Sequence, residues 1–293
     1  MTQIISLIGY QLKHSVSPHF QQAALDYYSL DVHYEARETE AEALTSVVNE
    51  LRQPQYLGGN VTTPYKEAVL SLLDETDDLA GLVGAVNTIV NREGRLLGFN
   101  TDTYGFIRAL REDAEFEPGN MRAVVLGAGG AARAVSFALL REGIRSLVIV
   151  NRTLSRAESL ACSLMEYVLA RGLSVDVVAL PKDDSKLRTV IKDCHLIVNC
   201  TVLGMKHSGC ERESPLPAHL IHKDVLVYDL VYNPLQTPLL AMAKEAGARV
   251  INGFAMLIYQ GAASFELWTG REAPIDIMLS AAKQALPAGV INK

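Results

Sequence analysis

The feature that most constrains this chain is a glycine-rich turn between an apolar strand and a helix of small residues, at residues 124–134 (VVLGAGGAARA). Gly127, Gly129 and Ala132 have the spacing of a dinucleotide-binding fingerprint, with alanine in its third position. Gly127 permits a tight turn, Gly129 lets the backbone approach a pyrophosphate, and Ala132 allows close helix–strand packing. The free N–H groups at the helix start favour an anion. We therefore expect a Rossmann-type unit whose cofactor contacts include Gly127, Ala128, Gly129, Gly130 and Ala131.

Residues 146–150 form a second predicted strand, and the residues that follow it indicate which dinucleotide is bound. An NAD-binding unit usually has Asp or Glu here, which holds the ribose 2′-hydroxyl. This chain has Asn151, Arg152 and Thr153, with Arg156 one turn later. A guanidinium can bind a 2′-phosphate through charge-assisted hydrogen bonds worth roughly 1.5–3 kcal/mol each, whereas a carboxylate would repel it. The pattern predicts NADP(H); the alternative is that both arginines are solvated residues at a helix start.

Composition narrows the class of protein. The 293 residues are 49% hydrophobic, enough for two domains with separate cores. A net charge of −6 without a basic run argues against a nucleic-acid partner, and no uninterrupted apolar segment has membrane-spanning length. Four cysteines without a CxxC pair favour a reduced, cytoplasmic setting. No metal is expected from Cys194, His195, Cys200, His207 and Cys210, because the first three flank or lie on a strand and would point in different directions.

Strand-like and helix-like segments alternate along the chain, which predicts an α/β protein built of two units. We expect the first unit at residues 1–102, joined by C-terminal helices at 255–293, and the nucleotide-binding unit at 103–254. Ligands in open α/β sheets bind beyond the carboxyl ends of the strands, so an active cleft is expected between the two units.

Within the first unit, three local predictions bear on the site. Residues 88–90 and 96–99 flank a turn at 91–94 and indicate a β-hairpin. Residues 18–28 and 64–73 are predicted helices, each with a proline close to its start.

Three polar segments of the first unit are candidates for chemistry. Ser15 and Ser17 lie at a predicted helix start, where two hydroxyls suit a carboxylate, although Ser17 could instead be the N-cap. Lys66 is predicted in the first turn of a helix, where the macrodipole disfavours a cation; this hints at function, and the alternative is a solvated surface lysine. Asn87 and Asp102 bracket the hairpin, and Asp102 could simply cap the next helix.

These segments together resemble the shikimate dehydrogenase family over nearly the whole chain and in order. The motifs that carry the resemblance are SxSP at 15–18, GNVTxPxK at 59–66, GAVNT at 84–88, NTD at 100–102, GAGGA at 127–131, NRT at 151–153, NxTxxGM at 199–205, DLVYNP at 229–234 and GxxMLxxQG at 253–261.

The resemblance implies an NADP-dependent oxidoreductase acting on a CH–OH group. The reaction would be the reversible reduction of 3-dehydroshikimate to shikimate, a step toward chorismate and the aromatic amino acids. The first unit would be the substrate-binding and catalytic domain. The substrate contacts it implies are Ser15 and Ser17 at the carboxylate, Tyr232 on the carboxylate side, and Thr62, Asn87 and Gln260 at the ring hydroxyls. Lys66 and Asp102 would be the catalytic pair, and further cofactor contacts are expected at Thr201, Gly253 and Met256.

The chemistry of the proposed pair agrees with that assignment. Reduction builds negative charge on the carbonyl oxygen, which a cationic Lys66 can stabilise and protonate. Asp102 would orient the ammonium and favour its charge, while removal from water opposes that charge. The sequence therefore leaves open which of the two is the formal general acid.

Two other functions compete with this interpretation. An NAD-preferring quinate/shikimate dehydrogenase would be indicated by an acidic residue near position 152, where this chain has arginine. A non-catalytic NADP-binding sensor would be expected to lose Lys66 or Asp102, and this chain keeps both. Asn252, where Asp is common in the family, is a departure near the cofactor side. Both a monomer and a homodimer are compatible with the sequence.

Overall fold

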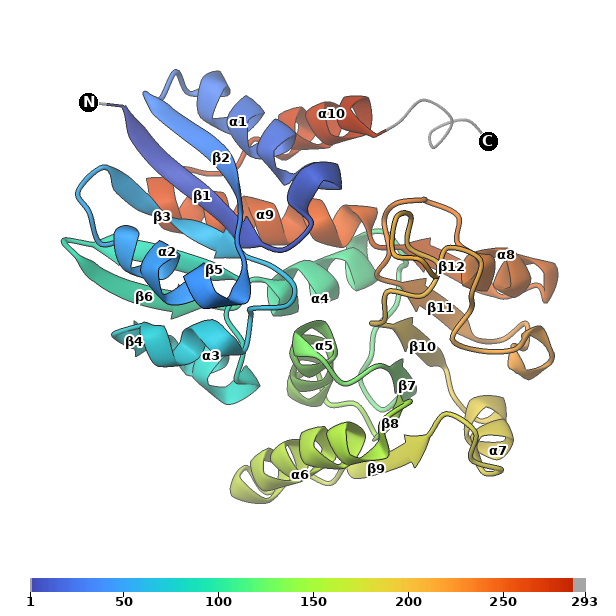
Figure 1. Cartoon of the computed structure of the whole chain (residues 1–293). Helices are drawn as coiled ribbons and strands as arrows, with labels where there is room; N and C mark the ends of the chain where they lie inside the picture. Colours follow the sequence, from blue (N-terminus) through green and yellow to red (C-terminus); the bar gives the residue numbers. More distant parts are fainter. Residues whose placement is uncertain (1, 287–293) are drawn as a thin grey trace. The chain divides into compact units, whose positions relative to one another are not determined.

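The computed structural model describes residues 2–286, which fall into two compact units (Figure 1). Of the described residues, the first unit contains 2–105 and 258–286, and the second contains 106–257. The chain enters the second unit within α4 (Asp102–Glu112) and returns within α9 (Phe254–Thr269). Among the described residues, no helix combines the length and apolarity needed to cross a bilayer.

The first unit is built on a mixed six-stranded sheet with the order β2-β1-β3-β5-β6-β4. β1 runs parallel to β2 and β3, whereas β5 is antiparallel to both β3 and β6. The predicted hairpin is confirmed, since β5 and β6 pair around Glu93 and Gly94, both at positive φ. The strands are β1 (Gln3–Gly9), β2 (Val32–Glu38), β3 (Tyr56–Val61), β4 (Glu75–Thr76), β5 (Thr88–Arg92) and β6 (Arg95–Phe99).

Helices cover both faces of this sheet. Successive residues of β3 point to opposite faces, so neighbouring residues of this strand meet different helices. A Cβ on Gly58 would lie 2.9 Å from Trp268 Nε1 of α9, whereas one on Gly59 would lie 3.6 Å from the Leu51 side chain. α1 packs on α9 through the hydrogen bond from Gln21 Nε2 to Gly261 O (2.9 Å) and also on α10. The other face is covered by α2 and η3. The remaining bounds are η1 (Leu12–His14), α1 (Ser17–Tyr27), η2 (Ala41–Ala43), α2 (Leu44–Glu50), η3 (Ala68–Leu72), α3 (Asp78–Val83) and α10 (Ile275–Ala285).

The predicted helix at residues 64–73 is wrong. Only the 3₁₀ helix η3 forms there, beginning at Ala68, and Lys66 lies in the preceding turn. The Lys66 carbonyl accepts a hydrogen bond from Val86 N (2.7 Å), 20 residues later, so it does not form the i+4 bond of a helix. The argument that a helix macrodipole disfavours Lys66 therefore fails, and its importance must rest on its contacts.

The second unit is a sheet of six parallel strands in the order β12-β11-β10-β7-β8-β9. This is the doubly wound dinucleotide-binding order, which reverses direction between β7 and β10 and places ligands beyond the carboxyl ends at that point. The strands are β7 (Arg122–Leu126), β8 (Ser146–Asn151), β9 (Asp176–Pro181), β10 (Leu196–Asn199), β11 (Leu226–Asp229) and β12 (Arg249–Asn252).

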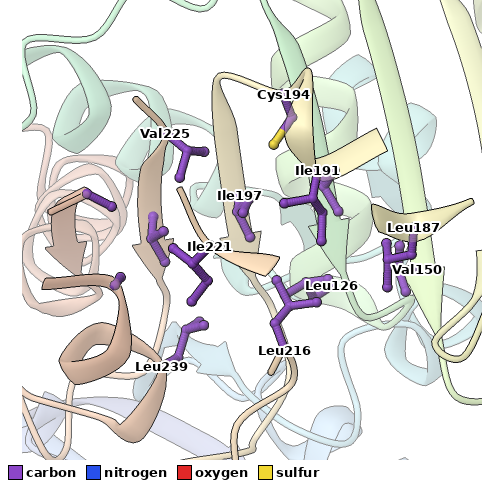
Figure 2. Close-up of a cluster of buried hydrophobic side chains, with 14 of the residues drawn as sticks. Leu126, Val150, Leu187, Ile191, Cys194, Ile197, Leu216, Ile221, Val225 and Leu239 are labelled. Atoms are coloured by element: carbon purple, nitrogen blue, oxygen red, sulfur yellow. The ribbon is translucent and has the colours of Figure 1, made fainter. Parts of the chain in front are cut away.

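Helices pack on both faces of the second sheet as well. α5 (Gly130–Arg141) and α6 (Leu154–Ala170) pack on β7, β8 and β9. The opposite face carries α7 (Leu187–Lys192), η4 (Ala218–Leu220) and α8 (Pro238–Glu245). Figure 2 shows the core on that side, where Leu187 and Ile191 of α7 and Leu239 of α8 lie near strand residues such as Ile197. The two units thus give the mixed α/β fold that the sequence predicted.

Candidate active site and cofactor site

The polar segments of the first unit meet at one edge of its sheet because of strand direction. β1, β3 and β6 end at the same edge, and β5 begins there. The loops after β1 and β3 touch, since a Cβ on Gly9 would lie 2.4 Å from Thr62 Cγ2 and Tyr10 N donates to Thr63 O (3.2 Å). Loops at the carboxyl ends of parallel strands are where α/β proteins bind ligands.

The centre of this edge is an ion pair between Lys66 and Asp102. Lys66 Nζ donates to Asp102 Oδ2 at 2.6 Å. The Asp102 side chain is 6% exposed and that of Lys66 is 17% exposed, so Lys66 is the more exposed member of the pair. Asp102 begins α4, but its two oxygens are occupied by Lys66 and Asn87, which argues against a simple capping role.

Asn87 connects the pair to other predicted site residues. Its Oδ1 accepts a hydrogen bond from Thr101 N (2.8 Å), and its Nδ2 donates to Asp102 Oδ1 (2.9 Å) and approaches Gln260 Oε1 (3.1 Å). The structure therefore brings together Lys66, Asn87, Asp102 and Gln260, although Gln260 is 173 residues from Asn87 in the chain. The cluster combines one reachable cation with amide groups that can donate and accept, which suits a polyhydroxylated ligand.

Ser15, Ser17 and Thr62 lie on loops of the same edge, apart from the ion pair. None of the three side chains hydrogen-bonds to Lys66 or Asp102 within residues 2–286. The N-cap prediction for Ser17 is wrong, because Ser17 is the first residue of α1 and no side chain caps that helix. Instead, Ser15 Oγ accepts a hydrogen bond from Ser17 N at 3.3 Å, which sets both hydroxyl-bearing residues in one turn.

The glycine-rich turn of the second unit has the form that the fingerprint predicts. Gly127 has φ = 114°, and a Cβ there would lie 3.3 Å from the backbone of Cys200. A Cβ on Gly129 would meet nothing within 4 Å, so open space faces this residue. No side chain caps α5, whose N-cap is Gly129. A helix start with free N–H groups beside open space fits a pyrophosphate.

The residues after β8 fit a negatively charged group on the ribose. Asn151 Nδ2 donates to Thr153 O (2.9 Å) and holds the turn. Arg152 and Arg156 are exposed, and neither forms an ion pair with any residue that the structure describes. Two solvated guanidinium groups without carboxylate partners are suited to a phosphate.

A buried carboxylate supports the loop after β10, and the sequence analysis missed it. Asn199 Oδ1 accepts from both the N–H and the hydroxyl of Thr201 (3.0 and 2.7 Å), and Asn199 Nδ2 donates to Asp229 Oδ1 (2.9 Å). Asp229 also accepts from Thr237 Oγ1 (2.6 Å) and Val231 N (3.1 Å). Burial raises the pKa of Asp229 to about 6, against these three donors, which lower it. Asn199 and Asp229 belong to two of the motifs that carry the family resemblance, but nothing in the sequence signals that they are partners.

The other predicted cofactor residues fall in the second unit with different surroundings. Gly253 is packed so tightly that a Cβ would lie 1.9 Å from Leu230 O, so glycine is needed there for packing. Met256 is buried. Tyr232, predicted as a substrate contact, lies in the same unit and is partly buried. Asn252 Oδ1 accepts from Phe254 N (3.0 Å) at the start of α9, a role that asparagine fills as well as aspartate.

Comparison with protein families matches three parts of the chain. Residues 7–89 match the family described as shikimate dehydrogenase substrate binding domain. Residues 112–202 match the family described as shikimate / quinate 5-dehydrogenase, and residues 253–283 match the shikimate 5′-dehydrogenase C-terminal domain.

Individual relatives extend this likeness over nearly the full length. The chain is 45% identical over 286 residues to a shikimate dehydrogenase (NADP⁺) of Methanopyrus kandleri, covering 97% of this chain and 96% of the relative. It is 44% identical over 287 residues to that of Moorella thermoacetica, covering 98% and 95%. Among solved structures, shikimate 5-dehydrogenase from Thermus thermophilus, in complex with NADP(H) and shikimate, superimposes with a TM-score of 0.83 at 40% identity, covering 97% and 100%.

Proposed function

The chain belongs to the shikimate dehydrogenase family, and from this premise we propose that it catalyses the reversible, NADPH-dependent reduction of 3-dehydroshikimate to shikimate. The observation that carries the proposal is the Lys66–Asp102 ion pair, at 2.6 Å, in which the lysine is the more exposed partner. This reaction is a step in the biosynthesis of chorismate and the aromatic amino acids. The four free cysteines agree with a reducing, cytoplasmic setting.

Lys66 has the chemistry that the reacting oxygen needs. Carbonyl reduction develops negative charge on oxygen, and an ammonium next to that atom both stabilises the charge and supplies a proton. Asp102 would hold the ammonium in place, and the two groups together would carry the proton that reaches the substrate oxygen. In the oxidative direction the same pair would remove the proton from the substrate hydroxyl.

The remaining predicted substrate contacts would orient the substrate. We assign Ser15 and Ser17 to the carboxylate, where two hydroxyls in one turn can donate together. Tyr232 is assigned to the carboxylate side. We assign Thr62, Asn87 and Gln260 to the ring hydroxyls. Asn87 and Gln260 already meet at 3.1 Å, so a ring hydroxyl could replace this contact on either amide.

The second unit has residues that fit NADP(H). The turn of residues 127–131 and the uncapped start of α5 would hold the pyrophosphate, and Asn151, Arg152, Thr153 and Arg156 the 2′-phosphate. Thr201, Gly253 and Met256 belong to the segments assigned to the rest of the cofactor. When bound, NADPH supplies the hydride.

The test is an initial-rate assay that follows the absorbance of the reduced nicotinamide. The purified protein is given shikimate or quinate with NADP⁺ or NAD⁺, in all four combinations. We expect turnover with shikimate and NADP⁺ to be at least about tenfold faster than with any other pair. A single charge-assisted hydrogen bond to the ligand accounts for a difference of that size. Preference for quinate and NAD⁺ would contradict the proposal, and no turnover with any pair would indicate a non-catalytic NADP-binding protein.

A further inference from the structure

Behind the Lys66–Asp102 pair, three hydroxyls and one amide close a ring of hydrogen bonds. Ser264 of α9 lies between Thr88 and Thr101, with Oγ–Oγ1 distances of 2.7 and 3.1 Å. Thr88 Oγ1 donates to Asn87 Oδ1 (3.1 Å), and Asn87 Nδ2 donates to Thr101 Oγ1 (2.9 Å). All four residues are at most 5% exposed, so bulk solvent does not reach them in this arrangement.

The direction of the ring follows from one backbone donor. Thr101 N can only donate, and it contacts Asn87 Oδ1 at 2.8 Å, so the amide oxygen is on this side and the nitrogen faces Asp102. Thr88 then donates to Asn87 Oδ1 and accepts from Ser264, at the shortest distance in the ring. Thr101 donates to Ser264 and accepts from Asn87 Nδ2. In this direction every hydroxyl of the ring donates one hydrogen bond within the ring and accepts one. Ser264 Oγ also lies 3.0 Å from Gln260 O and can share its proton with this carbonyl.

A second layer fixes the ring from the other side. Asn60 Nδ2 lies 3.2 Å from both Thr88 Oγ1 and Ser264 Oγ and donates to Asn87 O at 3.0 Å. Asn60 Oδ1 accepts from Tyr34 OH at 2.7 Å. Burial raises the pKa of Tyr34, so it remains a proton donor. Both layers are buried and polar, and such a network is fixed in one arrangement only when all its members are satisfied.

We propose that Ser264 is a positioning residue for the reaction: through Thr88 and Thr101 it holds the Asn87 amide so that one N–H points at Asp102 Oδ1. The other carboxylate oxygen, Oδ2, then stays available to Lys66 Nζ. Ser264 touches neither Lys66 nor Asp102 and acts only through Asn87. This inference rests on the function proposed above, because it concerns the orientation of the same ion pair.

Removal of the Ser264 hydroxyl opens the ring. Thr88 Oγ1 loses its donor at 2.7 Å and keeps the longer contact of 3.2 Å from Asn60 Nδ2. Thr101 loses its acceptor in the ring, and both hydroxyls are buried. The freed Thr101 hydroxyl has a competing acceptor in Asn87 Oδ1 at 3.2 Å. Asn87 Nδ2 likewise has a competing acceptor, Gln260 Oε1, at 3.1 Å, so the Asn87 amide can turn away from Asp102.

The test is the variant Ser264→Ala in the shikimate–NADP⁺ assay. We expect kcat to fall about tenfold, the effect of misplacing a catalytic group by a fraction of an ångström, with the KM for NADP⁺ changed less than about twofold. The matched control is Ser136→Ala in α5, a fully buried serine whose hydroxyl has no hydrogen-bond partner among residues 2–286. That control should keep kcat within about twofold of wild type.

A double-mutant cycle separates the ring from general destabilisation. Thr88→Val has nearly the same shape and opens the same ring, so alone it should also lower kcat about tenfold. Combined with Ser264→Ala, it should lower kcat by about the same tenfold, because the ring is already open. An additive loss of about a hundredfold, or an unchanged kcat in either single variant, would overturn the proposal. If Ser264→Ala does not fold, the kcat of Thr88→Val decides alone. An inactive wild type would contradict the proposed function itself, whereas an active wild type with unaffected variants would contradict only the role of Ser264.

Discussion

The two units each bury one aspartate at a strand end, and the partners of these aspartates differ. Asp102, after β6, accepts from the Lys66 ammonium and from the Asn87 amide. Asp229, at the end of β11, accepts from neutral donors of Thr237, Val231 and Asn199. Their exposed fractions are similar, 4% and 0%.

Under the proposed function, the difference separates a carboxylate that takes part in the reaction from one that supports a loop. The cation beside Asp102 is partly exposed and can pass a proton to a bound molecule. The donors around Asp229 are buried, and through Asn199 they fix the loop that carries Thr201. Burial alone therefore does not identify a catalytic acid; the presence of an accessible, titratable partner does.

The same contrast holds for the groups that would contact ligands. In the first unit Lys66, Asn87 and Asp102 are already bonded to one another. In the second unit the guanidinium groups of Arg152 and Arg156 stay in water. Preorganised groups lower the barrier of a chemical step, whereas solvated charges contribute to affinity once a counter-charge arrives. Substitutions in the first unit should thus change kcat, and those in the second should change KM for the cofactor.

The largest expected effect is that of Lys66→Ala. Loss of the proton donor and of the charge that stabilises the developing oxyanion should lower kcat about a thousandfold. The KM for shikimate should change little, because the orienting residues remain. Calorimetric titration of shikimate would verify that the site persists. A kcat within about tenfold of wild type would remove Lys66 from the mechanism.

The next effect concerns stability and belongs to Asp229. Its pKa of about 6 in the folded chain lies above its usual value of 3.8, so the folded state binds the proton more tightly. The stabilising contribution of the protonated group is present below about pH 4 and is lost as pH rises through about 6, a change of about 3 kcal/mol at about 1.4 kcal/mol per pKa unit.

Denaturant unfolding of wild type and Asp229→Asn at several pH values would measure this contribution. The free energy of unfolding of wild type should fall relative to that of the variant between about pH 4 and 6. Asp224→Asn, at an exposed aspartate just before β11, should give a difference that does not depend on pH in this way. If the difference in unfolding free energy between wild type and Asp229→Asn did not change with pH, the Asp229 carboxyl of wild type would be ionised at no cost, against this prediction.

Arg152→Ala should act on the cofactor alone. We expect the KM for NADP⁺ to rise about thirtyfold, equivalent to about 2 kcal/mol for a lost charge-assisted contact, with the KM for NAD⁺ nearly unchanged. Arg171→Ala is the control, since Arg171 is an exposed arginine at the other end of α6. Equal weakening of both cofactors would refute the assignment of Arg152 to the 2′-phosphate.

The smallest effect is expected from Gly129→Ala. The new methyl group would enter open space and leave the fold's stability unchanged, but it would occupy the room assigned to the pyrophosphate. The KM for NADP⁺ should rise about tenfold. Gly119→Ala, where the added Cβ would make one ordinary contact of 3.5 Å to Glu142 O, should leave it unchanged. If Gly129→Ala binds NADP⁺ normally, the pyrophosphate does not approach this glycine.

The local parts of this account could be predicted from the sequence because their signals are local. The Gly127–Gly129 turn and the hairpin of β5 and β6 depend on residues within a few positions of each other. The helix expected over 64–73 failed because the Lys66 carbonyl is taken by Val86, a partner from another segment. Proline near a helix start is a weak signal when such a bond competes with it.

The hydrogen-bonded support of both aspartates could not be predicted for the same reason. Ser264 is 176 residues from Thr88, and Asp229 is 30 residues from Asn199. Nothing in the spacing of single residues encodes such pairs; the strand order and the packing of α9 on β3 create them. The one available clue was Ser264 itself, a hydroxyl four residues after Gln260 in a mostly apolar helix.

The division of labour between the two units is tested most directly by the double variant Lys66→Ala/Arg152→Ala, assayed for NADP⁺ binding by calorimetric titration and for turnover with shikimate. The account predicts the NADP⁺ dissociation constant of Arg152→Ala alone together with the turnover of Lys66→Ala alone. If Lys66→Ala by itself weakens NADP⁺ as much as Arg152→Ala does, or if Arg152→Ala lowers kcat at saturating NADP⁺ as much as Lys66→Ala does, the two functions are not divided in this way.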